Sequence, residues 1–294
     1  MKKMIVRADD VGYSDVCNIG TFKSIEEGIV TSADIMPDAP GIVDALNRLK
    51  EMPWISIGWH SHFWCSPVLP AEKVPTLLIP GTNRFRHDLS KAEDISRDEL
   101  LAECRAQMER VVSILGRAPD TSDNRPDSIY GDVHRQICEE YGIAYGFARK
   151  NTKMRGLELP SEKWAHRNIL IADPQNAYAA LHTDNVLEVD KYDPASYYID
   201  DPDKLLELPD DVIVEQSWHP GYVDYFVYNE GDYGPRAKYF TVGRAIDVQA
   251  LCSQRLKDWI KEKKIELINY RDALYGTREY QNHLRNIGSD LFVG

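Results

Sequence analysis

The chain has 294 residues, of which 43% are hydrophobic, so it is long enough to bury a sizeable core in one large α/β domain or in two smaller ones. With 47 acidic against 35 basic residues the formal net charge is −12, and no cluster of lysine or arginine stands out, which argues against a nucleic-acid partner. The first apolar run, Met4 to Val6, is too short for a signal peptide or a membrane span. We therefore expect a cytoplasmic protein without a membrane partner.

Strands alternate with helices along the first part of the chain, and no repeat or linker rich in Gly, Ser and Pro divides it. After the first apolar run, Asp15 can cap a helix that reaches about Gly28. The pattern then predicts a strand over 29–36, a helix over 41–52 and a strand over 54–60. This β-α-β-α-β order implies parallel strands.

The strongest helix signal lies over 96–116, where Ser96 is followed three residues later by Glu99 as in a capping box, and Gly116 is a stop signal. Further helices are predicted over 127–142 and 248–264, and further strands over 143–148, 167–172, 211–218 and 265–270. The stretches 66–94 and about 183–211 lack clear periodicity, which is typical of functional or mobile loops. The chain is thus predicted to be α/β, with residues 1–294 forming a single (β/α) barrel-like domain.

Polar residues stand where several of these strands end. "RADDVGYS" follows the first strand, and because neighbouring strand residues point to opposite faces, Asp9 or Asp10 is expected to face inward. An ordinary strand-to-loop transition has the same composition, so this stretch by itself does not decide the point. The carboxyl ends of parallel barrel strands build active sites, which favours a functional interpretation.

The histidines of "IGWHSHFW" follow another predicted strand. His60 and His62 are two residues apart, hence on one face if the strand continues, and with a carboxylate they supply the N and O ligands of a divalent zinc-type site. Each histidine alone is more often structural. Five dispersed cysteines without a C-x-x-C pair indicate neither disulfides nor a structural zinc site, and Cys65 beside these histidines is more often an inert thiol than a nucleophile.

The motifs "ADDVGYS", "GIVTSADIMPDAP", "IGWHSHF" and "WHPGY", in this order, resemble those of the YdjC-like carbohydrate deacetylases, the ChbG/HpnK family. The resemblance covers Val6 to His60, Val212 to Tyr222 and the final helix and strand. It implies a (β/α) barrel with six or seven irregular parallel strands and a divalent metal ion. It further implies hydrolysis of the acetamido group of an N-acetylated sugar.

Carried over residue by residue, the resemblance implies that Asp10 and His60 bind the metal, that Asp9 is the base-like carboxylate, and that His219 is the histidine of the His-Pro motif. The chemistry of these residues then permits Asp9 to take the proton of the water and His219 to protonate the departing amine. The family's third ligand is a histidine, and in "DTSDNRPDSIYG" Arg125 stands in its place. A guanidinium has no lone pair to offer a metal, so this departure bears directly on the metal site.

A second resemblance concerns the same segment. "NRPDSIYGDVHRQICEEYGI" resembles the Arg-Pro-Pro-x-Gly segment of the NodB-type polysaccharide deacetylases, in which an arginine pairs with the catalytic aspartate. It implies that Arg125 holds Asp9 ionised and that His62 is the second metal histidine. Water or Asp123 could complete the metal shell instead.

We therefore predict a metal-dependent hydrolase that removes the acetyl group from a small N-acetylated saccharide, with zinc, magnesium, cobalt or manganese as the ion. Two alternatives stay open. The first is a carbohydrate-binding pseudoenzyme that lost its metal with the third histidine, and the second is a metal-dependent hydrolase of another amide or ester. The aromatic segments after residue 183 are as consistent with an oligomer-facing loop as with a sugar site, so a homo-oligomer is left open.

Overall fold

The strand that carries Asp9 and Asp10, β1 (Lys3–Val11), lies inside a curled sheet. The structure is a computed structural model that describes all residues except 124, 126, 153–155, 159–160, 173–191 and 231–234. The other strands are β2 (Ser32–Ile35), β3 (Ser56–Trp59), β4 (Thr121–Ser122), β5 (Ala148–Thr152), β6 (Gly156–Glu158), β7 (Ile169–Ile171), β8 (Ile213–Trp218) and β9 (Glu266–Leu267).

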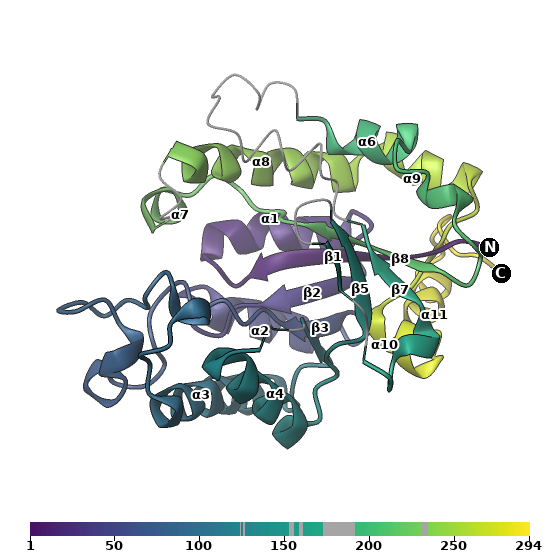
Figure 1. Cartoon of the computed structure of the whole chain (residues 1–294). Coiled ribbons are helices and arrows are strands. Elements are labelled where there is room, and N and C mark those ends of the chain that lie inside the picture. The colour runs from purple at the N-terminus through teal and green to yellow at the C-terminus, as the bar shows by residue number, and fades with distance from the viewer. Residues whose placement is uncertain (124, 126, 153–155, 159–160, 173–191, 231–234) are drawn as a thin grey trace.

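The sheet has the order β4-β3-β2-β1-β8-β7-β5-β6, and every neighbouring pair from β4 to β5 is parallel. β6 is antiparallel to β5, and β9 pairs in parallel with the start of β1. Figure 1 shows the sheet curling between helices on either side. The predicted α/β barrel-like fold with six or seven irregular parallel strands is therefore confirmed, in the form of a half-barrel.

Helices cover the outside of this half-barrel. α1, α6, α8 and α9 lie on one side of it and α2, α3 and α4 on the other (Figure 1). The helices are α1 (Asp15–Glu26), α2 (Ile42–Lys50), α3 (Arg97–Leu115), α4 (Ile129–Tyr141), α6 (Pro194–Asp200), α7 (Tyr225–Glu230), α8 (Pro235–Cys252), α9 (Gln254–Glu262), α10 (Tyr270–Tyr275) and α11 (Glu279–Asn286), with short 3₁₀ turns at Ala71–Lys73, Pro75–Leu77, Leu89–Lys91, Ala165–Arg167 and Leu205–Glu207. Among the described residues, no helix combines the length and the apolar character that crossing a membrane requires.

The strongest predicted helix, α3, begins and ends where expected. Ser96 Oγ accepts the backbone N–H of Glu99, and Gly116 closes the helix in a left-handed conformation with φ 81°. The Glu99 carboxylate accepts hydrogen bonds from the backbone and hydroxyl of Thr76. Glu99, which with Ser96 marks the start of the helix in the sequence, thus also binds the long loop around Thr76 to the helix.

Three predicted elements differ from the structure. The strand expected over 143–148 begins only at Ala148, because Gly146 takes a left-handed φ of 62° that an extended strand does not accommodate. The helix expected over 248–264 is divided at Ser253, whose hydroxyl accepts the backbone N–H of Leu256 and starts α9. The strand expected over 265–270 is shortened to β9, because Asn269 caps α10. Of the aperiodic stretch from about 183, the part before Tyr192 lies outside the described residues.

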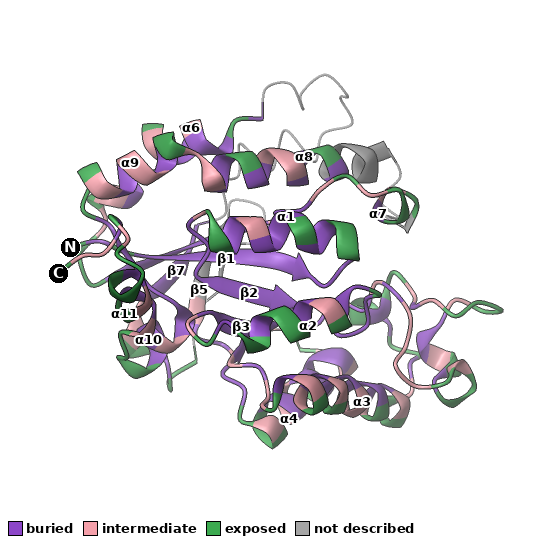
Figure 2. Ribbon diagram, turned by 180° about the vertical axis from the view of Figure 1, so that it is seen from behind, coloured by how far each residue is buried: buried purple, intermediate pink, exposed green. Residues whose placement is uncertain are grey.

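The alternation of β1 decides which of its side chains enter the half-barrel. Met4, Val6 and Ala8 belong to the large apolar cluster formed with the covering helices, whereas Ile5 joins a smaller cluster with residues of β7 and β8. Figure 2 shows β1 and β2 buried between helices whose outer faces are exposed. By the same alternation Arg7 and Asp9 share the inner side with Ile5, although both are charged and only 4% exposed.

Helix α1 packs closely on the segment that follows β8. A Cβ atom on Gly20 would lie 2.7 Å from the backbone of Gly221, and Thr21 Oγ1 donates a hydrogen bond to the Pro220 carbonyl. Because His219 precedes these residues directly, the close approach of α1 also fixes the position of that histidine.

Replacing Gly20 with alanine should lower the free energy of unfolding by about 1–3 kcal/mol, since the added methyl group forces two backbone segments apart. The measurement is urea denaturation followed by circular dichroism. Ile19→Ala, in the same helix but at a side chain that is 52% exposed, is the matched control and should change stability by about 0.5 kcal/mol or less. Equal stability of the two variants would contradict this account of the packing.

Candidate functional site

The ionisable residues that the sequence singled out gather at the carboxyl end of the parallel strands. Asp9 and Asp10 end β1, His60 directly follows β3, and His219 directly follows β8. Asp34 lies in β2, next to β1 in the sheet. Parallel strands end at the same edge, so residues far apart in sequence become neighbours there.

Arg7 is the centre of this group. Its Nε and Nη2 donate to the two carboxylate oxygens of Asp9 at 2.6 and 3.1 Å, and Nη1 donates to Asp123 Oδ1 at 3.0 Å. Glu215 Oε1 lies 3.1 Å from Nη1, and Asp34 Oδ2 lies 3.6 Å from Nε. Burial raises the pKa of Asp34 to about 8 and that of Glu215 to about 7, although the Arg7 charge opposes both shifts. One guanidinium therefore faces more carboxylates than it can neutralise.

Asp10 points to a different set of partners. It has a left-handed backbone, with φ 58°, which is uncommon for a residue other than glycine and is found at functional sites. Its Oδ2 accepts from Arg244 Nη2 at 2.5 Å, and its Oδ1 lies 3.1 Å from His60 Nε2. Burial would raise the pKa of Asp10, but Arg244 and His60 hold it well below the usual range. Asp10 is therefore ionised at neutral pH.

Several donor atoms around His60 suit a metal ion. Asp9, Asp34 and His60 can each place one ligand atom within 4.8 Å of the other two. Asp34 Oδ1 and His60 Nδ1 are buried and make no hydrogen bond, which is costly unless another partner is present. Two or more carboxylates with an imidazole are ligands that divalent metals accept. The residues present therefore fit a divalent ion.

Gly58 leaves the space that Asp34 needs. A Cβ atom at position 58 would lie 2.0 Å from Asp34 Oδ1, so any other residue there would displace this carboxylate. The two positions pair across the parallel strands β2 and β3. The glycine of the "IGWHSHF" motif is thus explained by the acid on the neighbouring strand.

His219 lies close to Asp9. Its Nε2 is 3.8 Å from Asp9 Oδ2, and its backbone N–H donates to Asp247 Oδ2 at 2.9 Å. Burial lowers the pKa of His219 to about 4, despite the opposing charges of Asp10 and Asp9. At neutral pH this imidazole is therefore neutral and able to accept a proton.

His62 and Arg125 are on the side of the site that faces β4. The His62 ring centre is 4.1 Å from that of His60, and its pKa lies well below the usual value because it is buried near the charges of His60 and Arg125. Arg125 Nε donates to Ser61 Oγ at 3.0 Å. From the sequence we predicted Arg125 as the partner of Asp9, but in the structure Arg7 takes that place. The reason is local, because Arg7 is two residues before Asp9 on one strand and both side chains share one face.

Four residues of the site were not assigned from the sequence: Arg7, Asp34, Glu215 and Arg244. The first three could have been found, because a charged residue inside an otherwise apolar, central strand is rarely buried without a partner. Arg244 carries no such signal, since it lies 234 residues from its partner Asp10 and on a helix.

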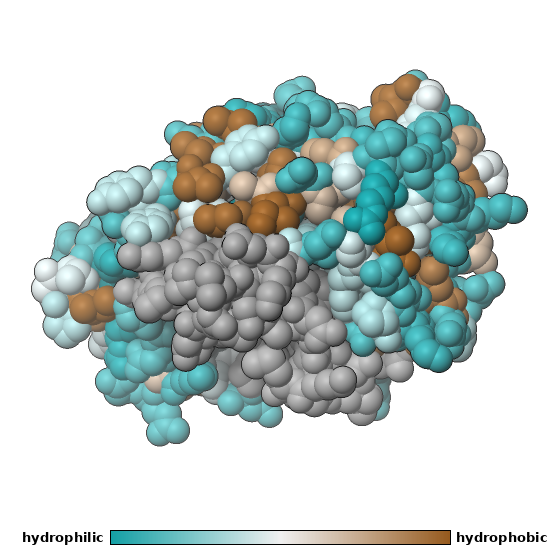
Figure 3. Space-filling view, turned by 90° about the horizontal axis from the view of Figure 1, so that it is seen from above, coloured by the Kyte–Doolittle hydropathy of each residue, from teal (hydrophilic) through white to brown (hydrophobic). Residues whose placement is uncertain are grey.

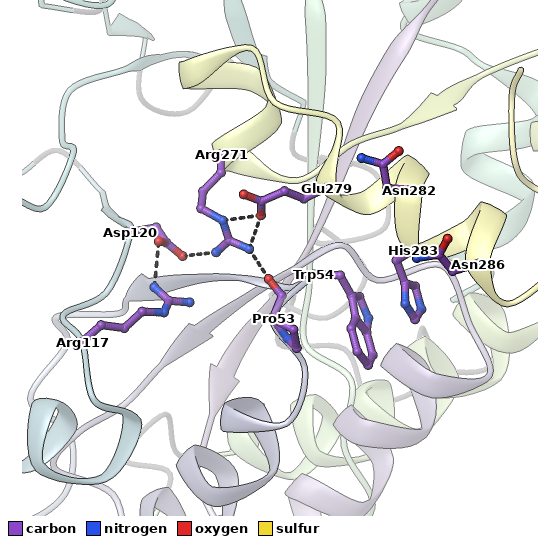
Figure 4. A pocket seen from close by; sticks show the side chains of 9 residues that line it. All are labelled: Pro53, Trp54, Arg117, Asp120, Arg271, Glu279, Asn282, His283 and Asn286. Atoms are coloured by element: carbon purple, nitrogen blue, oxygen red, sulfur yellow. Dashed lines mark hydrogen bonds and ion pairs between the residues drawn. The ribbon is translucent and has the colours of Figure 1, made fainter.

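A pocket at the amino end of the parallel strands, away from the acidic site, has a structural role. It is lined by Pro53, Trp54, Arg117, Asp120, Arg271, Glu279, Asn282, His283 and Asn286 (Figure 4). Arg271 donates to Asp120 at 2.7 Å and to Glu279 at 2.6 Å, and Trp54 stacks on His283 with ring centres 3.8 Å apart. Because these groups satisfy one another, the pocket ties α10 and α11 to the sheet. It offers no charged group without a partner to a ligand.

The surface above α8 carries apolar side chains, which gather beside atoms drawn in grey in Figure 3. The exposed large apolar residues of α1, α7, α8 and the segment before α7 are Val16, Ile19, Val223, Tyr225, Phe226 and Val242. Phe226 packs edge-on against Tyr13, whose ring lies 5.3 Å from the Arg244 guanidinium. The aromatic side chains of Phe226 and Tyr13 thus lie next to Arg244, the partner of Asp10 in the acidic site.

Comparison with known proteins finds relatives that are named as deacetylases and match most of this chain. A carbohydrate deacetylase of Enterococcus faecalis is 28% identical over 281 residues, covering 92% of this chain and 97% of that protein. A chitooligosaccharide deacetylase of Proteus mirabilis is 27% identical, covering 92% and 98%. The crystal structure of an Enterococcus faecalis protein described as a cellobiose-phosphate cleavage protein superposes with a TM-score of 0.66 at 22% identity, covering 92% and 98%, and so shares the fold.

The family described as YdjC-like protein matches residues 3–262, which include the whole acidic site and all the strands that carry or precede its aspartates and histidines. The match continues through the middle of the chain, where the motifs are weakest. This protein therefore belongs to the YdjC-like family.

Proposed function

We propose that this protein is a hydrolase that removes the acetyl group from a small N-acetylated saccharide. The observation that carries the proposal is the placement of Asp9, which Arg7 holds by both oxygens and which has the neutral His219 at 3.8 Å and a ring nitrogen of His60 within 4.8 Å. Relatives over nearly the whole chain are named as carbohydrate and chitooligosaccharide deacetylases, and they support the choice of an acetamido substrate.

We further propose a divalent metal ion held by His60 together with the aspartates around it, Asp10 and Asp34. The buried Asp34 Oδ1, which makes no hydrogen bond, and the position of Asp10 Oδ1 3.1 Å from His60 Nε2 support this assignment. Zinc, magnesium, cobalt and manganese all accept such nitrogen and oxygen donors. When bound, the ion would polarise the acetyl carbonyl and lower the pKa of an attacking water.

The protein's own groups then handle the proton. Asp9 accepts a proton from the attacking water, and Arg7 keeps its carboxylate in one orientation while this happens. His219 is neutral and close to Asp9 Oδ2, so it can receive that proton and pass it to the amide nitrogen. Protonation makes the nitrogen a competent leaving group, and the C–N bond breaks to give acetate and the free amine.

A saccharide-binding protein without a metal is the second candidate. The observation that favours it is the number of guanidinium groups: Arg7 on Asp9, Arg244 on Asp10, and Arg125 where the resemblance places a third ligand. Elemental analysis of the purified protein separates the two candidates, since the hydrolase should contain about one divalent ion per chain.

Replacing His60 with alanine should abolish stoichiometric zinc or manganese binding, because this residue takes part in every arrangement of donors described above. Isothermal titration calorimetry measures the affinity. Asp34→Asn and Asp10→Asn should each weaken binding by about 10-fold or more, comparable to the loss of a well-placed supporting carboxylate. His87→Ala, at an exposed histidine, is the control and should bind like the wild type. Unchanged affinity in His60→Ala would refute the assignment.

Asp9→Asn and His219→Gln should each slow acetate release from a chitobiose-like substrate by about two to four orders of magnitude, the usual scale for acid–base groups. Substrate affinity should stay within about threefold, because neither group is needed to hold the sugar. A coupled acetate assay at saturating metal gives kcat and KM separately. If both variants kept near wild-type turnover, the proton path through Asp9 and His219 would be wrong.

The pH dependence of kcat/KM should report His219. Its pKa of about 4 in the folded protein means that it is neutral above this pH and protonated below it. A protonated imidazole cannot receive a proton, so activity should fall as the pH drops through about 4. In His219→Gln the residual activity should lack this limb, whereas an unchanged limb would assign it to another group.

A further inference from the structure

Arg125 lies at the edge of the site, beside the segment that carries His60 and His62. Its Nε donates to Ser61 Oγ at 3.0 Å, and Ser61 is bonded in the chain to both His60 and His62. Asp123, two residues earlier in the chain, accepts a hydrogen bond from Arg7, which in turn holds Asp9. The guanidinium therefore contacts the histidine segment, and the chain segment that carries it also supplies a carboxylate partner of Arg7.

One end of this guanidinium has no partner. Arg125 Nη2 is buried and makes no hydrogen bond in the structure. A guanidinium is always charged and is a donor only, so the missing partner must be an acceptor, most favourably an oxygen with negative charge. Arg271, by contrast, uses Nε, Nη1 and Nη2 to bind Glu279, Asp120 and the Pro53 carbonyl. Arg271 is therefore structural, because each of its three nitrogens has a partner, whereas Arg125 Nη2 has none.

We propose that Arg125 Nη2 donates a hydrogen bond to the acetyl carbonyl oxygen of the substrate and stabilises the charge that develops on it. This inference rests on the proposed function. As the water oxygen bonds to the carbonyl carbon, the C=O electron pair moves to oxygen and the water proton moves to Asp9. When the C–N bond breaks, the C=O bond forms again and the proton leaves with the amine. Arg125 gains and loses nothing, and it acts through a charge-assisted hydrogen bond.

The position of Arg125 explains why this chain can do without a histidine there. The resemblance assigns that position to a metal ligand, which a guanidinium cannot be. A fixed cation at the same place still offers positive charge to the same carbonyl oxygen. Tyr130, whose ring centre is 5.9 Å from the guanidinium carbon, lies beside the group on its helix side and limits its movement.

The test compares Arg125→Met and Arg125→Lys with the wild type in the acetate-release assay. Arg125→Met should lower kcat by about 10²- to 10³-fold, as loss of an oxyanion donor does, with KM changed by less than about threefold. Arg125→Lys should recover only part of kcat, because an ammonium has no planar fork. Methylguanidinium added to Arg125→Ala should restore turnover, which loss of a purely structural arginine would not allow.

Arg135→Met is the matched control, since Arg135 reaches the Arg125 carbonyl at 3.4 Å and lies outside the site. It should keep wild-type kcat, and thermal unfolding should show that all variants are folded. Turnover of Arg125→Met within about threefold of the wild type would overturn the proposal, as would a loss confined to KM.

A binding measurement separates this inference from the proposed function. Acetate, the product that carries the same oxygen, should bind the wild type about 10-fold more tightly than Arg125→Met, as followed by NMR titration. If the wild type releases no acetate from any N-acetylated saccharide, the proposed function fails, and this titration still decides whether Arg125 holds a carboxylate oxygen. Equal acetate affinity in wild type and Arg125→Met would refute the assignment.

Discussion

The site depends on one buried guanidinium. Arg7 lies on the inner face of β1 and contacts carboxylates that come from β1, β2, β8 and the segment after β4. Removing one member of such a buried pair costs about 3–5 kcal/mol, because the partner charge is left without compensation. Arg7 thus joins the strands of the half-barrel at their functional edge and orients Asp9. The same residue supports the fold and the chemistry.

The excess of carboxylates over cations around Arg7 sets the electrostatics of the whole edge. Burial without enough positive charge raises the pKa of Asp34 and Glu215, so these groups retain protons unless a cation relieves them. Asp10 has its own arginine and keeps its charge. Two neighbouring aspartates therefore have different surroundings, which is consistent with the separate roles, base and metal ligand, that we propose for them.

Membership in the YdjC-like family agrees with the barrel-like fold, and the acidic edge of the sheet carries three arginines. Arg7, Arg125 and Arg244 all lie at or beside the site, on β1, after β4 and on α8. Two of them bind the adjacent aspartates, and Arg125 keeps one nitrogen without a partner. The arginines that bind aspartates position the site, and the third is the one that we propose to contact the substrate.

The sequence by itself determined the α/β class, the parallel direction of the strands and the residues at the strand ends, because strand alternation and helix capping are local. It placed α3 by Ser96 and Gly116, and it singled out Asp9, Asp10, His60 and His219, which the structure brings to one edge. Only the tertiary structure decided the partners. Arg7 rather than Arg125 holds Asp9, because Arg7 and Asp9 lie on one face of β1, whereas Arg125 follows β4, which is three strands away in the sheet. Arg244 reaches Asp10 because α8 packs over α1. Such long-range contacts depend on how helices and strands pack, and no local pattern encodes them.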